Sequence, residues 1–269
     1  MQKVTALFGA TMRAAAFLTR LNISGRAFEA HDPQNSQENR QPYRLGDDAA
    51  GFPLVGLIVA APAALLLFGL PAFGFSPLVA AVLAVVAMIA MTGGLHEDGL
   101  ADVADGLGGH HPRDRALEIM HDSRVGSYGA IALILSIGLR AALLAELAAS
   151  EPTLAACAVL AAAAASRGGM ALFWALTPSA LETGLAARVG EPSRQAGWLA
   201  AGLGAAIALV FGLPTAGLLP VTSAILLAAG VFLWLRCFVM RRIGGQTGDC
   251  LGAFQQLAEI AILIGLAIG

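Results

Sequence analysis

Three aspartates follow the second long apolar segment of the chain at spacings of four and three residues. These residues are Asp98, Asp102 and Asp105. On a helix, such spacings place all three side chains on one face, where their like charges would repel one another. Carboxylate oxygens are the protein ligands that Mg²⁺ prefers, together with substrate phosphates. The pattern predicts a magnesium site for a phosphorylated substrate. The structural alternative is a helix end whose acids simply face water.

A second acidic stretch follows in the same loop. Asp114, Glu118 and Asp122 recur every four residues and would share one helix face, with Arg113 and Arg124 on either side. Taken alone, such a short helix is most often a solvated surface helix. Beside the first three aspartates, it favours a site in which two acidic helices face each other and hold one or two cations.

A polar turn precedes the last apolar segment. It contains Gln246, Thr247 and Asp249. The backbone N–H groups at the start of a helix attract anions, although Asp249 could simply be the helix N-cap. The two interpretations are compatible if Thr247 contacts a phosphate and Asp249 contacts a metal ion or a hydroxyl.

Two arginines, Arg140 and Arg167, lie inside predicted membrane spans. A charge there costs about 3 kcal/mol, so it should face a partner in the bundle interior. Arg167 could reach a diphosphate, and the structural alternative is an ion pair, for example with Glu146 or Glu259. His96 precedes the aspartates and could act as a base, because imidazole titrates near neutral pH. A supporting hydrogen-bonding role is the alternative for His96.

The composition is that of a membrane protein. The 269 residues are 57% hydrophobic and 13% charged, with a mean hydropathy of +0.74, whereas soluble domains carry about 25% charged residues. Seven apolar runs come close to the roughly 20 residues that a membrane span needs. We therefore predict an all-α polytopic integral membrane bundle of about seven spans, with six to eight compatible. The runs are 52–70, 77–95, 129–149, 154–176, 197–213, 219–240 and 251–268.

Lysine and arginine occupy alternate connections of this predicted bundle. The connections at 71–77, 150–153 and 214–220 contain neither residue, whereas the other connections and the N-terminal region contain several. The positive-inside rule predicts that the basic connections and every polar motif face the cytoplasm at a bacterial inner membrane. This one-sided arrangement favours an enzyme over a transporter, which needs polar groups in the middle of the bilayer. Nucleic acid is not an expected ligand, because no large basic patch is present.

The first 48 residues differ from the rest of the chain. Residues 4–21 are apolar but interrupted by two arginines, which predicts an amphipathic helix lying on the membrane or against the bundle. Residues 22–48 are polar and predict a loop. The predicted organisation is an N-terminal helix and loop at 1–48 and a single catalytic transmembrane bundle at 49–269, with a short cytoplasmic acidic helix.

These motifs together resemble the cobalamin synthase family, the adenosylcobinamide-GDP ribazoletransferases. Glu97 stands where the family typically has a leucine, and residues 22–24 replace a proline-containing turn. Matching blocks occur in family order over nearly the full chain. They are Phe17-Leu18-Thr19-Arg20-Leu21, Phe52-Pro53-Leu54-Val55-Gly56, Gly93-Gly94-Leu95-His96, Asp98-Gly99-Leu100-Ala101-Asp102, Asp105-Gly106, Arg113-Asp114-Arg115, Glu118-Ile119-Met120, Asp122-Ser123-Arg124, Ser166-Arg167-Gly168 and Gly244-Gly245-Gln246-Thr247-Gly248-Asp249.

The resemblance implies the last assembly step of cobalamin synthesis. Adenosylcobinamide-GDP is joined to α-ribazole or its 5′-phosphate, GMP leaves, and Mg²⁺ is the cofactor. The protein is expected to lie in the lipid bilayer. A homo-oligomer, or contacts with other corrinoid-pathway enzymes, would be compatible with the resemblance. The candidate metal ligands are Asp98, Asp102, Asp105, Glu118 and Asp122. The candidate catalytic residues are His96, Asp98, Asp102, Asp105 and Asp122, and the candidate substrate-binding residues are Arg20, Arg113, Arg124, Arg167, Gln246, Thr247 and Asp249.

Two other functions stay open. The metal motif of CDP-alcohol phosphotransferases begins Asp-x-x-Asp-Gly, which Asp102 and Asp105 match. The Ala-Arg that should follow is replaced by Gly109 and His110, so we treat this likeness as an analogy of mechanism. A membrane transporter or scaffold is the alternative of another class, and the bare outer connections argue against it.

Overall fold

The computed structural model describes residues 2–23, 44–181 and 189–268 of the chain. Most of the polar loop predicted at 22–48 therefore lies outside the described residues. The described residues form helices, and their one β-type contact is an isolated bridge between Ser179 and Gln246. The predicted all-α bundle is confirmed.

The helices follow the apolar runs of the sequence closely. In chain order they are α1 (Gln2–Leu18), the 3₁₀ helix η1 (Leu45–Gly51), α3 (Phe52–Gly69), the 3₁₀ helix η2 (Leu70–Phe73), α4 (Pro77–Thr92), α5 (Leu95–Gly108), α6 (Arg113–Met120), α7 (Ser127–Ser150), α8 (Pro152–Leu176), α10 (Arg194–Ala216), α11 (Leu218–Arg242) and α12 (Gly248–Leu266). Among the described residues, six segments are long and apolar enough to cross a membrane, or seven if the bent pair α4–α5 is one span. The predicted count of about seven agrees with this range.

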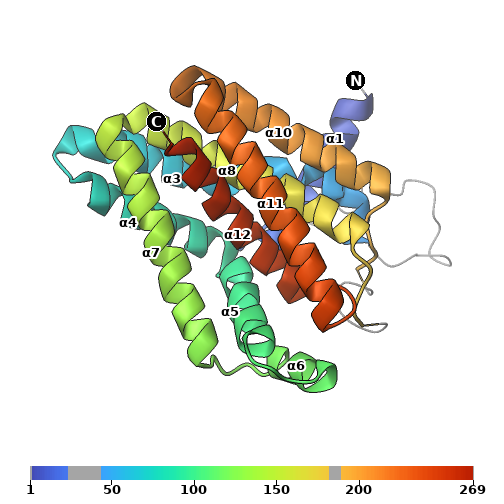
Figure 1. Cartoon of the computed structure of the whole chain (residues 1–269). Helices are drawn as coiled ribbons and strands as arrows, with labels where there is room; N and C mark the ends of the chain where they lie inside the picture. The colour runs from blue at the N-terminus through green and yellow to red at the C-terminus, as the bar shows by residue number, and fades with distance from the viewer. Residues whose placement is uncertain (1, 24–43, 182–188, 269) are drawn as a thin grey trace.

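The chain bends by 91° between α4 and α5. Gly93 and Gly94 form the break with φ angles of 67° and 75°, a conformation that glycine adopts without the steric penalty of other residues. The apolar run predicted as one span at 77–95 therefore ends at Thr92. The helix that carries the aspartates turns out of the spanning direction, and α5 and α6 lie together at one end of the bundle (Figure 1).

Helices α8 and α12 form the centre of the bundle. Most of each helix is buried, with α8 between α3 and α10 and α12 against α5, α8 and α11. An alanine run at 161–165 lets the neighbours of α8 approach closely, which is how helices pack in membranes without bulky side chains. The more exposed helices α4, α7, α10 and α11 surround this centre (Figure 1).

The two ends of the bundle differ in chemistry. The connections α3–α4, α7–α8 and α10–α11, which contain no lysine or arginine, lie at the end opposite α5 and α6 (Figure 1). The N-terminal helix α1 is tucked against the bundle, where the Arg13 guanidinium binds the Asp48 carboxylate through Nε–Oδ2 and Nη2–Oδ1 contacts of 2.9 and 2.6 Å. Both side chains are buried. The boundary predicted after residue 48 falls inside η1.

Candidate active site

Four carboxylates gather where α5 meets the start of α12. Asp98, Asp102 and Asp105 lie on α5, and Asp249 lies in the first turn of α12. The helices approach closely at Gly99, where a β-carbon would lie 2.8 Å from the backbone oxygen of Asp249. The structure thus adds Asp249 to the row of aspartates that the sequence spacing predicted.

The charges of these acids are not balanced by basic side chains. No lysine or arginine in the described part of the chain forms an ion pair with any of the four. Partial burial, followed by repulsion from Asp249, Asp98 and Asp105, raises the pKa of Asp102 to about 7. α5 turns away from α4 and lies with α6 at one end of the bundle, and Asp102 is only partly buried there. Electrostatically, the cluster favours a bound cation.

Asp105 already has hydrogen-bond partners. Its two carboxylate oxygens accept bonds from the backbone N–H groups of Gly126 and Gly129, at 2.7 and 2.8 Å. These groups lie at the start of α7, where the first N–H groups of a helix have no partner within the helix. Asp105 therefore joins α5 to α7 in this structure.

The second acidic stretch does not join the four carboxylates. Glu118 is exposed and pairs with Arg115 at 2.7 Å. Asp122 accepts a hydrogen bond of 3.0 Å from Nε of Arg124, and the bonds from Arg124 hold the pKa of Asp122 at about 2. The short helix predicted here exists as α6, but its acids face solvent and neighbouring arginines.

His121 is a site residue that the sequence pattern did not indicate. It follows α6 and lies within electrostatic reach of both Asp102 and Asp249. Its Nδ1 lies 2.6 Å from the Leu117 carbonyl oxygen. A single histidine at no particular spacing gives little signal, and the proximity arises because the loop after α6 folds back toward α5.

The donor chemistry of the four acids fits Mg²⁺, which binds carboxylate oxygens. Within the described ranges, however, no three His, Cys, Asp or Glu side chains converge closely enough to hold an ion as they stand. Both oxygens of Asp105 accept backbone N–H groups, which leaves Asp98, Asp102 and Asp249 as the candidate ligands among the four acids. Glu118 and Asp122 lie apart with arginine partners.

Two predicted substrate-binding residues hold backbone segments together. The Arg113 guanidinium donates to the carbonyl oxygens of Ile243 and Ala180, at 3.0 and 2.7 Å. Gln246 is fully buried, and its side-chain amide has no hydrogen-bond partner within the described residues. Its backbone pairs with the segment that follows α8. Both residues fix the loop that leads into α12.

Thr247 and Asp249 form the start of α12. The Thr247 hydroxyl accepts the backbone N–H of Cys250 at 3.4 Å and donates to Oδ2 of Asp249 at 3.1 Å. Thr247 is thus the N-cap of α12. The alternative considered from the sequence, in which Asp249 is the N-cap, is wrong. The hydrogen bond from the Thr247 hydroxyl orients the Asp249 carboxylate, which lies beside the acids of α5.

A buried charge cluster lies deeper in the bundle and consists of Glu97, Arg140, Arg167 and Glu259. Arg140 pairs with Glu97 at 2.9 Å and with Glu259 at 3.3 Å, and Arg167 lies 3.8 Å from Glu259. Gln255 donates to Glu259 at 2.6 Å. The ion pair with Glu259 that the sequence offered as an alternative for Arg167 is present. All four charges are buried, so Arg167 does not present a free guanidinium to substrate here.

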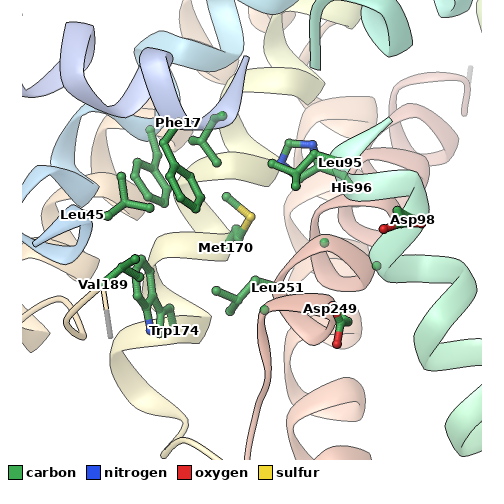
Figure 2. A pocket seen from close by; sticks show the side chains of 15 residues that line it. Phe17, Leu45, Leu95, His96, Asp98, Met170, Trp174, Val189, Asp249 and Leu251 are labelled. Carbon is green, nitrogen blue, oxygen red and sulfur yellow. The ribbon is translucent and has the colours of Figure 1, made fainter. Parts of the chain in front are cut away.

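Two cavities flank Asp98. The larger one has a volume of about 690 Å³ and is lined by Arg20, Thr92 and Glu97 among others. The smaller one, of about 130 Å³, is mostly apolar. Figure 2 shows Phe17 and Trp174 on one side of the smaller cavity and His96, Asp98 and Asp249 on the other. Asp98 therefore stands between two spaces that could hold two different molecules.

His96 lies at the wall of the smaller cavity and is almost fully buried. The charges of Arg167 and Arg140 act on it. Its Nε2 has no hydrogen-bond partner in the part of the chain that the structure describes. The imidazole is thus available to a molecule that enters the cavity.

Comparison with known proteins identifies the family. Residues 10–267 match the family model described as cobalamin-5-phosphate synthase. The chain is 44% identical over 261 residues to the adenosylcobinamide-GDP ribazoletransferase of Sinorhizobium medicae, covering 95% of each chain. It is 45% identical over 264 residues to the enzyme of that name from Rhizobium etli, covering 96% of this chain and 95% of the relative. The Brucella anthropi protein of the same name is 40% identical over 263 residues, 97% of each chain.

No solved structure matches the fold significantly. The family model and the relatives cover both the acid row of α5 and the start of α12. This chain therefore belongs to the cobalamin-5-phosphate synthase family.

Proposed function

We propose that the chain joins adenosylcobinamide-GDP to α-ribazole or its 5′-phosphate and releases GMP. The family and the names of its relatives support this reaction. The observation that carries the proposal for the site is the group of four carboxylates at the contact of α5 with α12, without a basic partner among the described residues. Such a group suits a reaction on an anionic diphosphate only if a cation joins it.

The reaction exchanges one bond to phosphorus for another. A ribose hydroxyl oxygen bonds to the phosphorus attached to the cobinamide arm, and the bond from that phosphorus to the bridging oxygen of the diphosphate breaks. The bridging oxygen leaves with GMP, and the hydroxyl proton must pass to a base. Both reactants carry or develop negative charge, so positioning and charge neutralisation supply most of the acceleration.

We assign the cation site to Asp98, Asp102 and Asp249, with Asp105 as the acid that anchors α5 to α7. Bound Mg²⁺ would neutralise the diphosphate and the developing charge on GMP. Asp98 lines both cavities, so its carboxylate oxygen that is not bound to the cation would accept the hydroxyl proton. Arg20 lines the larger cavity and can bind a phosphate of the activated corrinoid.

We further propose that the acid-bearing end faces the cytoplasm at a bacterial inner membrane. The connections at the opposite end lack lysine and arginine, whereas Arg113, Arg115 and Arg124 lie in the segment between α5 and α7, at the acid-bearing end. This bias follows the positive-inside rule. Water-soluble substrates would then reach the site from the compartment that makes them.

Product formation by the full chain in lipid nanodiscs tests the proposal. With adenosylcobinamide-GDP and α-ribazole, we expect GMP release that requires Mg²⁺ and falls about 100-fold or more in Asp102→Asn. Asp114→Asn is the matched control, because Asp114 is an exposed acid on α6, and it should keep near-normal activity. Activity without divalent cation, or equal activity of Asp102→Asn, would contradict the metal role.

A further inference from the structure

The smaller cavity beside Asp98 is lined by residues from both the N-terminal and the C-terminal helices. Its volume is about 130 Å³, and α1, α3, α5, α8 and α12 contribute to its lining. In Figure 2, Met170 and Leu251 lie between the aromatic side, marked by Trp174, and the acidic side, marked by Asp249.

The size of the cavity limits its occupant. An apolar cavity of about 150 Å³ takes one benzene molecule, whereas pockets for drug-sized ligands start at about 300 Å³. The enclosed volume of about 130 Å³ is close to that of one aromatic ring, and because the cavity is open on one side, a somewhat larger flat ligand would extend through its mouth. A corrin macrocycle cannot enter it.

The lining suits a flat ring that carries a nitrogen. Phe52 and Trp174 stack with ring centroids 6.4 Å apart and an interplanar angle of 28°, and Met170 is buried beside them. Such side chains pack favourably on aromatic faces. Nε1 of Trp174 and Nε2 of His96 are buried and lack hydrogen-bond partners among the described residues. A ring nitrogen of a ligand would satisfy one of them.

We propose that this cavity binds the methylated benzimidazole base of ribazole. This inference rests on the proposed function and names the subsite for the attacking substrate. The base is flat, bicyclic and largely apolar, with one free ring nitrogen. With the base in the cavity, the attached ribose lies at the rim near Asp98 and Asp249, where its hydroxyl must react.

Guanine, the aromatic base of the other substrate, suits this cavity less well. Its edge carries hydrogen-bonding groups on most sides, and a mostly apolar wall would leave them without partners. The larger cavity on the other side of Asp98 has more room and is lined by Arg20. The two substrates would then approach the acids from opposite sides.

Filling the cavity tests the assignment by kinetics. Leu251 lines the cavity on α12, and Leu257 is also half-buried on α12 but lies outside it. In Leu251→Trp, we expect KM for α-ribazole to rise at least tenfold while KM for adenosylcobinamide-GDP stays within twofold. Leu257→Trp should leave both values within twofold. An unchanged KM for α-ribazole in Leu251→Trp, or a rise only for the corrinoid substrate, overturns the proposal.

Direct binding tests the cavity without requiring turnover. Trp198 and Trp234 are exposed, so replacing both by Phe leaves Trp174 as the fluorescent reporter. We expect 5,6-dimethylbenzimidazole to change Trp174 emission saturably and GMP not to do so. An absent or non-saturating response, or an equal response to GMP, overturns the proposal. A saturating response in a chain without transferase activity would keep the subsite and reject the proposed reaction, so the two failures are distinguishable.

Discussion

Two neighbouring residues of α5 belong to opposite electrostatic environments. Glu97 is buried and lies 2.9 Å from Arg140 in a cluster with two acids and two arginines. Asp98 is exposed and lies among acids without a basic partner in the described chain. A buried charge is tolerated when it is paired and hydrogen-bonded, whereas a group of like charges at the water boundary is costly without a ligand. The first arrangement fixes α5, and the second is suited to binding.

Glu97 also ties the acid-bearing helix α5 to its neighbours. Glu97 connects α5 to α7 through Arg140 and to α12 through Gln256, whose Nε2 donates to Glu97 Oε1 at 3.1 Å. These are the helices that border the acid row. Glu97 therefore holds α5 against both α7 and α12.

Removing one partner of the buried charge cluster should have the largest effect. Arg140→Leu leaves Glu97 and Glu259 facing each other without Arg140, and loss of one partner of a buried pair costs about 3–5 kcal/mol. We expect this loss of free energy of unfolding in denaturant titrations of the protein in detergent. Activity should fall with the fraction of folded protein.

Glu97→Leu is the matched control for that variant. It removes a charge as well, but Arg140 keeps Glu259 at 3.3 Å. We expect a smaller loss than in Arg140→Leu, and the double variant should be less destabilised than the sum of the two. Equal losses in both single variants would show that the cluster does not act as paired charges.

Asp105→Ala should have the next largest effect. The substitution removes two hydrogen bonds from the carboxylate to the N–H groups of Gly126 and Gly129. Bonds to charged acceptors and helix caps of this kind contribute about 2 kcal/mol. We expect that loss of unfolding free energy, with faster hydrogen exchange at the start of α7, and partial recovery in Asp105→Asn. Unchanged exchange at those amides would contradict the anchoring role.

The pH dependence of metal-free protein reports on Asp102. Its pKa of about 7 exceeds the ordinary value of 3.8, so between pH 4 and 7 the folded state keeps a proton that the unfolded state releases. Stability therefore falls as pH rises through this range. Because Asp102 is only half-buried, screening by water reduces the effect to on the order of 1 kcal/mol. Asp102→Asn should remove this slope in urea titrations without Mg²⁺, and parallel curves for both proteins would refute the assignment.

The sequence predicted the helices and the helix that carries Asp98, Asp102 and Asp105, and the features that it did not predict are set by tertiary geometry. Spacing alone placed Asp98, Asp102 and Asp105 on one face. The spacing of Glu118 was interpreted in the same way, yet the Glu118 side chain faces solvent. Periodicity identifies the residues that share a helix face, but it does not say what packs against that face. The approach of Asp249 to α5 depends on tertiary packing. The consecutive glycines before α5 carried a signal for the 91° bend, since paired left-handed glycines end helices.

Glu118→Gln should have the smallest effect and separates the two acidic helices most sharply. Glu118 is exposed and pairs with Arg115 at 2.7 Å on the surface of α6, a contact worth at most about 0.5 kcal/mol. We expect stability, activity and the Mg²⁺ concentration for half-maximal activity all to stay within about twofold of the unsubstituted chain, measured beside Asp102→Asn. A tenfold higher Mg²⁺ requirement in Glu118→Gln would mean that α6 moves against α5 when the ion binds. In that case the second acidic stretch would belong to the metal site, as its spacing predicted, and the comparison between paired and unpaired acids would hold only for the metal-free protein.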